Sequence, residues 1–117
     1  MRVLVLVKAT DVSETEQASP EWTRDMLAAM GRFNQELKEA GLLLDVAGLK
    51  PTANAKRITF NGTARTVIDG PFAETKELVA GYWLWEVKNI DEAVSWVKRC
   101  PNPMPVPSEI EIRPLYE

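Results

Sequence analysis

An uninterrupted apolar run, Val-Leu-Val-Leu-Val at residues 3–7, stands between Arg2 and Lys8 near the start of the chain. Side chains alternate between the two faces of a strand, so a strand over residues 2–8 is apolar on both faces. Strands of this kind lie within sheets that are covered on both sides. Both faces of this sheet must therefore be shielded from water by other parts of the structure.

A long helix is predicted after residues 9–19, which are polar and are expected to form a loop. Ser19 is a suitable N-cap and Pro20 suits the first helical position. Apolar residues then recur at spacings of three and four, which predicts one buried stripe that ends at Gly41. Members of this stripe, all expected in the core, include Trp22, Met26, Met30, Phe33 and Leu37.

A hairpin is predicted by Asn61-Gly62, which separates strand-like runs at residues 56–60 and 63–68. Asn-Gly between such runs is a strong hairpin signal, because the turn positions favour positive φ. Further strands are expected at residues 42–49, 82–87 and 109–113. A second helix is expected from Asn89, where Asn89 and Glu92 resemble a capping box.

This order of elements predicts an α+β fold of the ferredoxin-like βαββαβ type with an inserted β-hairpin, in a single domain over residues 1–117. Two helices can cover only one face of such a sheet. Because no third helix is predicted, we expect a homodimer in which the open faces of two sheets meet.

Composition excludes several classes of protein. The net charge of −3 gives no basic surface for nucleic acid, and no apolar run is long enough to span a membrane. The single cysteine, Cys100, cannot form an internal disulfide, so a cytoplasmic location is expected. The chain has no histidine, which excludes a histidine general base and histidine metal ligands.

The densest cluster of charge and turn residues is Asp-Gly-Pro-Phe-Ala-Glu-Thr-Lys-Glu at residues 69–77. Asp69 either stabilises a turn by accepting a hydrogen bond from the backbone two residues on, or faces a cleft as a base. Phe72 either fills the core or provides a stacking surface. Glu74 and Lys76 either form a solvated face or point into a pocket, where they hold a polar substrate or move a proton. Glu77 either lies in the first turn of a short helix or binds ligand.

Two further residues are candidates for ligand binding. Trp83 either packs in the core or an interface, or forms the wall of a pocket for a flat organic ligand. Arg113 either pairs with a carboxylate on its sheet or clamps an anionic ligand. Oxygen ligands from Asp69, Glu74 and Glu77 are compatible with a metal, but their spacing matches no known site. We therefore expect no metal and no cofactor.

The motif at residues 69–77, followed by Gly81-Tyr82-Trp83-Leu84, resembles the signature of the YciI-related proteins in the branch often called the DGPF domain. The ending at residues 109–115 is similar to the same branch. This resemblance implies a dimeric α/β barrel, a superfamily that includes isomerases, small monooxygenases and ligand-binding regulatory modules, so the fold alone does not select a function. The His–Asp pair suspected in YciI itself cannot be carried over, because this chain has no histidine.

Three hypotheses follow for function. In the first, the chain binds a small organic molecule in a cleft at residues 69–77, where Asp69 or Glu74 acts as a base and Lys76 or Arg113 stabilises charge. In the second, it is a non-catalytic regulatory or protein-interaction module, a setting suggested by the sigma-factor genes that often neighbour genes of this branch. In the third, the loop is only a structural turn.

Overall fold

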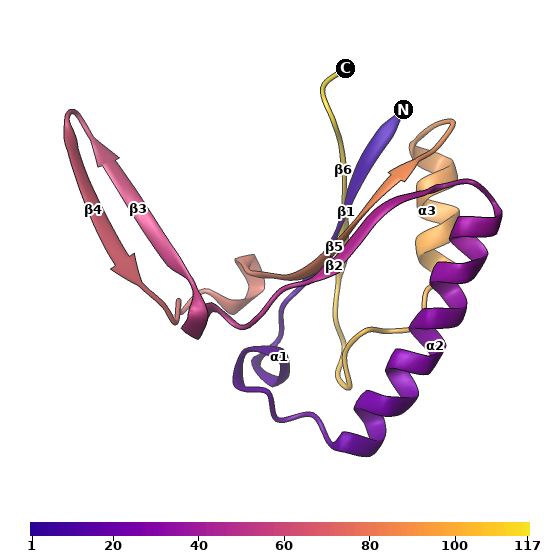
Figure 1. Cartoon of the computed structure of the whole chain (residues 1–117), viewed down its shortest axis with the longest axis horizontal. Helices are drawn as coiled ribbons and strands as arrows, with labels where there is room; N and C mark the ends of the chain where they lie inside the picture. The colour runs from indigo at the N-terminus through magenta and orange to yellow at the C-terminus, as the bar shows by residue number, and fades with distance from the viewer.

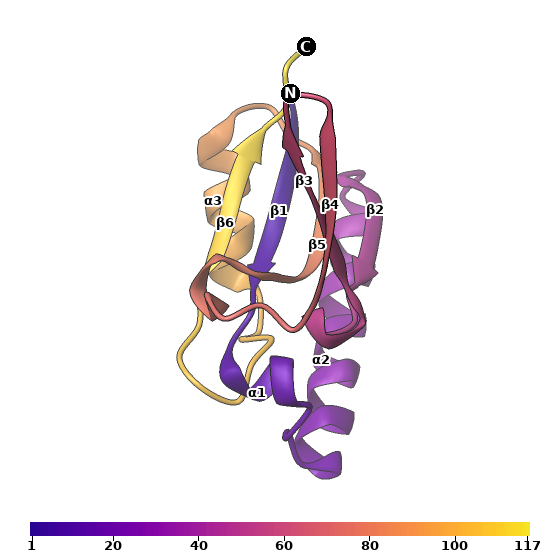
Figure 2. The same cartoon turned by 90° about the vertical axis from the view of Figure 1, so that its left-hand side faces the viewer.

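A four-stranded antiparallel sheet with two helices on one face forms the body of the protein, as the computed structural model of residues 1–117 shows (Figures 1 and 2). The strands of the sheet lie in the order β2-β5-β1-β6. Their bounds are β1, Arg2–Lys8; β2, Leu43–Gly48; β5, Val79–Glu86; and β6, Ile110–Pro114. The two long helices are α2, Pro20–Glu39, and α3, Ile90–Arg99.

This arrangement is the ferredoxin-like α+β fold that the order of elements predicted. Two βαβ units interleave, so that β1 and β5 occupy the centre of the sheet. The predicted hairpin is inserted between β2 and β5 and forms a separate two-stranded sheet of β3, Lys56–Asn61, and β4, Ala64–Asp69. No helix combines the length and the hydrophobicity that crossing a membrane requires.

The core lies between the sheet and the helices. Val3, Val5 and Val7 of β1 and Trp83 and Trp85 of β5 are buried on this face. Register places them side by side, with Val3 opposite Trp85 and Val5 opposite Trp83. The core is completed from α2 by Phe33, which packs edge-on against Trp83, and by Leu37.

The other face of the sheet has no cover. Leu4 and Leu6 of β1 lie opposite Leu84 and Tyr82 of β5, and all four are half-buried. Their neighbours on the outer strands are mostly charged: Asp45 pairs with Leu84, Arg113 with Leu4, and Glu111 with Leu6. The prediction of a strand that is apolar on both faces is therefore confirmed, and the open face has an apolar centre with a charged border.

The two ends of α2 are capped at the residues that the sequence predicted, Ser19 and Gly41. The Ser19 hydroxyl accepts a hydrogen bond from the Trp22 amide at 3.1 Å. At the other end, Gly41 has a φ of 79°, and the Leu42 amide donates back to the Leu37 carbonyl, which is a Schellman motif. On α3 the Asn89 side chain caps as predicted, but the Glu92 carboxylate accepts from the Lys88 amide rather than from that of Asn89.

Two local predictions need correction. Residues 9–19 contain a short helix, α1, Asp11–Thr15, because Thr10 and Ser13 form a reciprocal capping box. The hairpin turn is displaced by one residue: Asn61 pairs with Ala64, so Gly62 and Thr63 form the turn. Only Gly62, with a φ of 59°, has positive φ there, which is typical of a type II′ turn rather than a type I′ turn.

Candidate functional site

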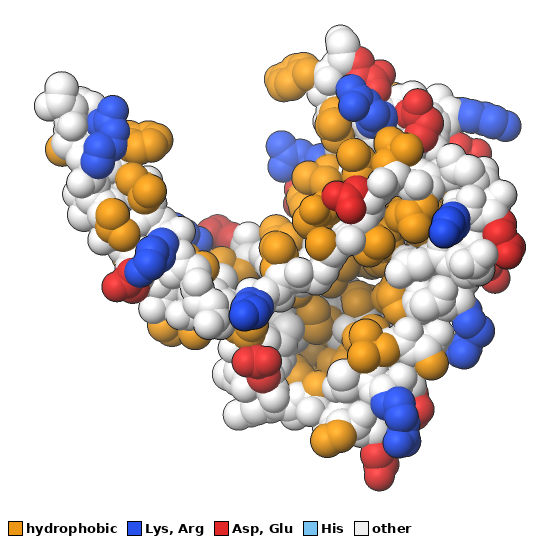
Figure 3. Space-filling model, viewed as in Figure 1, with side chains coloured by type: hydrophobic (Ala, Val, Ile, Leu, Met, Phe, Trp, Pro, Cys, Tyr) orange, Lys and Arg blue, Asp and Glu red, His pale blue; other side chains and the backbone are white.

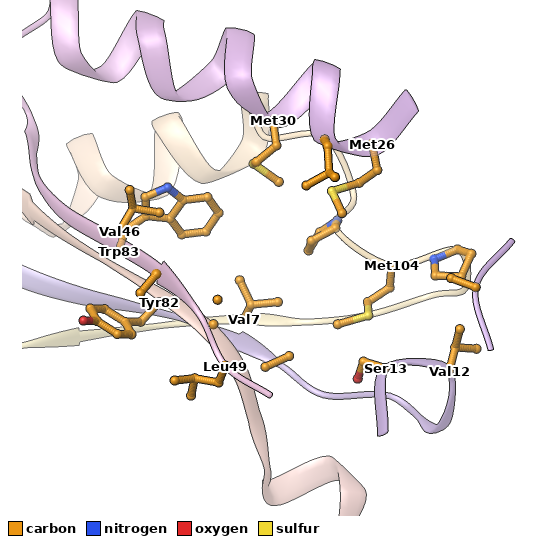
Figure 4. Close-up of a pocket in the computed structure, with 18 of the residues that line it drawn as sticks. Val7, Val12, Ser13, Met26, Met30, Val46, Leu49, Tyr82, Trp83 and Met104 are labelled. Atoms are coloured by element: carbon orange, nitrogen blue, oxygen red, sulfur yellow. The ribbon is translucent and has the colours of Figure 1, made fainter. Parts of the chain in front are cut away.

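An apolar cavity of about 400 Å³ lies beneath the N-terminal half of α2 (Figure 4). Hydrophobic residues make up 14 of the 19 that line it, so it suits an apolar ligand. Figure 4 shows Met26, Met30, Trp83 and Met104 around the space. Other residues of the lining include Val7, Val12, Ser13, Trp22, Val46 and Leu49.

The cavity exists because α2 is longer than the sheet that it covers. Its 20 residues extend for about 30 Å, whereas the six residues of β2 extend for about 20 Å. The C-terminal half of the helix therefore packs on the sheet, and the N-terminal half projects past its end (Figure 1). Trp22 and Met26 are half-buried cavity residues, which corrects the expectation that they lie in the core, whereas Met30 lines the cavity and also packs against the core.

Two short segments close the cavity below the sheet. Val12 and Ser13 of α1 form one part of the wall, and the loop at residues 103–105 forms another. Asn102 fixes that loop: its side-chain oxygen accepts from the Met104 amide at 3.0 Å, and its side-chain nitrogen donates to the Val106 carbonyl at 3.0 Å. The two segments meet where the Thr10 hydroxyl contacts the Met104 sulfur at 3.4 Å.

No charged side chain lines the apolar cavity. The Tyr82 ring turns away from the space in Figure 4, and its hydroxyl lies 3.2 Å from an Asp45 carboxylate oxygen, whose charge raises the pKa of Tyr82. The Trp83 indole N–H donates to the Asn34 side-chain oxygen at 2.7 Å. The cavity therefore offers shape and hydrophobicity for binding but no acid or base of its own.

A polar hollow of about 860 Å³ lies on the other side of α1. Val12 lines both spaces, so they share a wall. Only four of the 13 residues that line the hollow are hydrophobic. Its charged residues are Lys8, Asp11, Glu74, Lys76 and Glu109.

Residues 1–117 match the family described as the YCII-related domain. The chain belongs to the YCII-related domain family. An uncharacterised protein of Rhizobium meliloti (strain 1021) is 34% identical over 105 residues, which cover 90% of this chain and 85% of that protein.

The YCII-related signature at residues 69–77 divides between two places. Glu74 and Lys76 line the polar hollow, and Lys8 donates to the Glu77 carbonyl at 3.3 Å nearby. Asp69 instead forms an ion pair with Lys56 across the base of the β3–β4 hairpin. Phe72 lies beneath the Arg57 guanidinium, with 3.8 Å between the guanidinium carbon and the ring centroid.

The remaining predicted site residues lie elsewhere. Trp83 is buried in the wall of the apolar cavity, and Arg113 pairs with Glu111 at 3.1 Å on the open face of the sheet. The structure thus brings Glu74 and Lys76 together but separates them from Asp69, Phe72 and Arg113.

Sequence reasoning missed three charged residues of the hollow: Lys8, Asp11 and Glu109. They come from segments far apart in the chain, and the signal that could have united them is the topology. The end of β1 and the start of β6 are neighbours in the ferredoxin-like sheet, so Lys8 and Glu109 meet there, where the Lys8 amide donates to the Glu109 carbonyl at 3.1 Å. No group of three or more metal-ligating side chains converges anywhere in the chain.

Proposed function

We propose that the protein binds a small organic molecule whose apolar part occupies the cavity beneath α2. The observation that carries this proposal is the lining of the cavity, which is almost wholly apolar and includes Trp22, Trp83 and three methionines. A volume of about 400 Å³ lies within the range of small-molecule sites, and methionine side chains adapt to ligands of varied shape.

Acid–base catalysis is the second candidate, and the polar hollow supports it. In this candidate Glu74 acts as the base and Lys76 stabilises negative charge, and the position of both residues in the lining of one hollow supports these roles. A ligand with an apolar body and a polar end would reach both spaces only past Val12 of α1. The reaction would need no cofactor, since proton transfer uses only these side chains.

We also propose that the functional unit is a cytoplasmic homodimer. The open face of the sheet supports the dimer, because Leu4, Leu6 and Leu84 have no cover within the chain. Two such faces packed together would form the barrel that the resemblance implies. The lone Cys100, which cannot form an internal disulfide, supports the reducing compartment.

Filling the cavity tests the binding proposal. Thermal-shift measurements with benzoate, indole and naphthalene should show a rise in Tm for at least one probe with the natural protein. Met26→Trp and Met30→Trp, which fill the cavity, should abolish that rise, whereas Ala28→Trp on the exposed side of the same helix should keep it. A shift that survives in both filled variants, or no shift with any probe, would contradict the proposal.

Catalysis and binding are then separated by substitutions in the hollow. Glu74→Gln and Lys76→Met should leave the Tm shift of the apolar probes unchanged, because neither residue lines the cavity. Loss of turnover of a substrate found in a metabolite screen, with the Tm shift retained, would support Glu74 and Lys76 as catalytic residues.

A further inference from the structure

The β3–β4 hairpin projects from the body as an isolated arm, residues 56–69 (Figures 1 and 2). All twelve residues of its two strands are exposed. A two-stranded hairpin alone is at best marginally stable in water, and an exposed hairpin of this length usually packs against something. No other part of the chain therefore shields the arm from water.

The arm has one apolar face. Directly paired residues point to the same side of a hairpin, so the pairs Ile58–Val67 and Phe60–Arg65 share a face. Ile58, Phe60 and Val67 are 57%, 71% and 60% exposed. The opposite face is mostly polar and includes the pair Thr59–Thr66.

The arm lies across a gap from the open face of the sheet (Figure 1). Figure 3 shows hydrophobic side chains along the side of the arm that faces this gap and on the sheet beyond it. The sheet side of the gap carries Leu4, Leu6 and Leu84. Both walls thus carry hydrophobic side chains, so a body that fills the gap would contact the sheet and the arm together.

Contacts at its base join the two strands of the arm to the segments that flank it. Lys56 and Asp69 pair across the two strands, Arg57 stacks on Phe72, and the Gly70 amide donates to the Ala55 carbonyl at 2.9 Å. Gly70 also lies so close to Thr52 that an added Cβ would be 1.7 Å from the Thr52 carbonyl oxygen. The signature therefore fixes the angle of the arm.

Charge favours a second copy of the chain as the body in the gap. The arm carries three basic residues and one acidic residue, whereas the rest of the chain carries 11 basic and 16 acidic residues. A basic arm is attracted to an acidic body, and Asp45 and Glu111 border the apolar centre of the open face together with Arg113, which pairs with Glu111.

We propose that the arm clasps a second copy of this chain, with Ile58, Phe60 and Val67 buried against the partner that occupies the gap. By two-fold symmetry, the arm of the partner makes the same contact in return. The inference rests on the proposed dimer and extends it, because it assigns the DGPF signature the role of fixing a reciprocal clasp. Each arm then gains the cover that its own chain lacks.

The test compares two charge substitutions on opposite faces of the arm in the full chain. Phe60→Asp should weaken the dimer by at least about tenfold in Kd, because a carboxylate would be buried in an apolar contact. Thr66→Asp adds the same charge to the other face and should change Kd by less than about threefold. Sedimentation equilibrium over a range of concentrations measures both.

A labelling experiment gives an independent readout. In a Cys100→Ser background, Phe60→Cys should react with a maleimide slowly in the dimer and faster on dilution, while Thr66→Cys should react fast throughout. A Phe60→Asp dimer of natural affinity together with fast labelling at position 60 would overturn the clasp. If Leu84→Asp nevertheless breaks that dimer, the proposed face-to-face dimer stands and only the clasp fails; a natural protein that stays monomeric contradicts both.

Discussion

The carboxylate of Glu14 holds Thr52 by both of its donors, accepting from the Thr52 amide at 3.1 Å and from the Thr52 hydroxyl. The same hydroxyl accepts from the Phe72 amide at 3.1 Å. These bonds join three segments: helix α1, which closes the apolar cavity; the turn before the arm; and the signature at its base. The wall of the cavity and the base of the arm therefore belong to one hydrogen-bonded unit.

Removing the carboxylate of Glu14 should loosen this unit. Glu14→Ala leaves the half-buried Thr52 amide without an acceptor, which costs about 1–3 kcal/mol of unfolding free energy. Asp25→Ala removes an equal charge from an exposed site and should change stability by less than about 0.5 kcal/mol. Urea unfolding measures both variants, and equal stabilities would contradict the expectation.

Gly70 should tolerate no side chain. In Gly70→Ala the added carbon would overlap the Thr52 carbonyl oxygen, and a backbone atom cannot rotate away, so we expect a loss of about 1–3 kcal/mol or more. Gly31→Ala on α2 has open space around it and should instead stabilise the helix by up to about 1 kcal/mol. Thermal and urea unfolding of the pair give the comparison, and a neutral Gly70→Ala would show that the turn can move.

Asn34 should stabilise the fold by accepting the hydrogen bond of the Trp83 indole N–H. Asn34→Ala leaves the buried indole N–H without a partner, so a loss of about 1–3 kcal/mol is expected. Its neighbour Gln35 bonds only to Glu39 on the exposed side of the same helix, and Gln35→Ala should cost less than about 0.5 kcal/mol. Equal changes in the two variants would contradict this role of Asn34, because both substitutions introduce alanine, the stronger helix former.

Burial raises the pKa of the Cys100 thiol to about 11, from an ordinary value of 9.0. Below pH 9 the thiol should therefore react with iodoacetamide roughly 100-fold more slowly than in the unfolded chain, because the thiolate is the nucleophile. The folded state holds its proton more tightly, so the thiol stabilises the fold fully below pH 9 and this contribution is lost between pH 9 and 11. Plots of unfolding free energy against pH for the natural protein and for Cys100→Ala should converge or cross between pH 9 and 11. Parallel plots would contradict the raised pKa.

Much of the fold could be predicted from local patterns. Capping signals at Ser19 and Asn89 and the order of elements were sufficient for the two long helices and the ferredoxin-like topology, because each depends on neighbours in the sequence. The separation of the hairpin from the sheet could not be predicted. Alternation along residues 56–69 shows that the strands have two faces, but it carries no information about which surface covers them.

The candidate site was predictable only in part, for a similar reason. Glu74 and Lys76 share the hollow as one hypothesis required, but its other charges are assembled by tertiary structure. The apolar cavity was missed because Trp22, Met26 and Met30 have the same spacing whether a helix packs on a sheet or extends past its end. Only the relative lengths of α2 and β2 distinguish a core from a cavity.

The arm has two strands and therefore two outer edges, each with backbone amides and carbonyls that pair with nothing in its own chain. Such edges are templates for further strands, and the apolar face beside them adds to the hazard. A substitution that separates the two copies would therefore produce a monomer whose unpaired strand edges and apolar arm face are exposed to solvent. We expect such variants to aggregate at lower concentrations than the natural protein does.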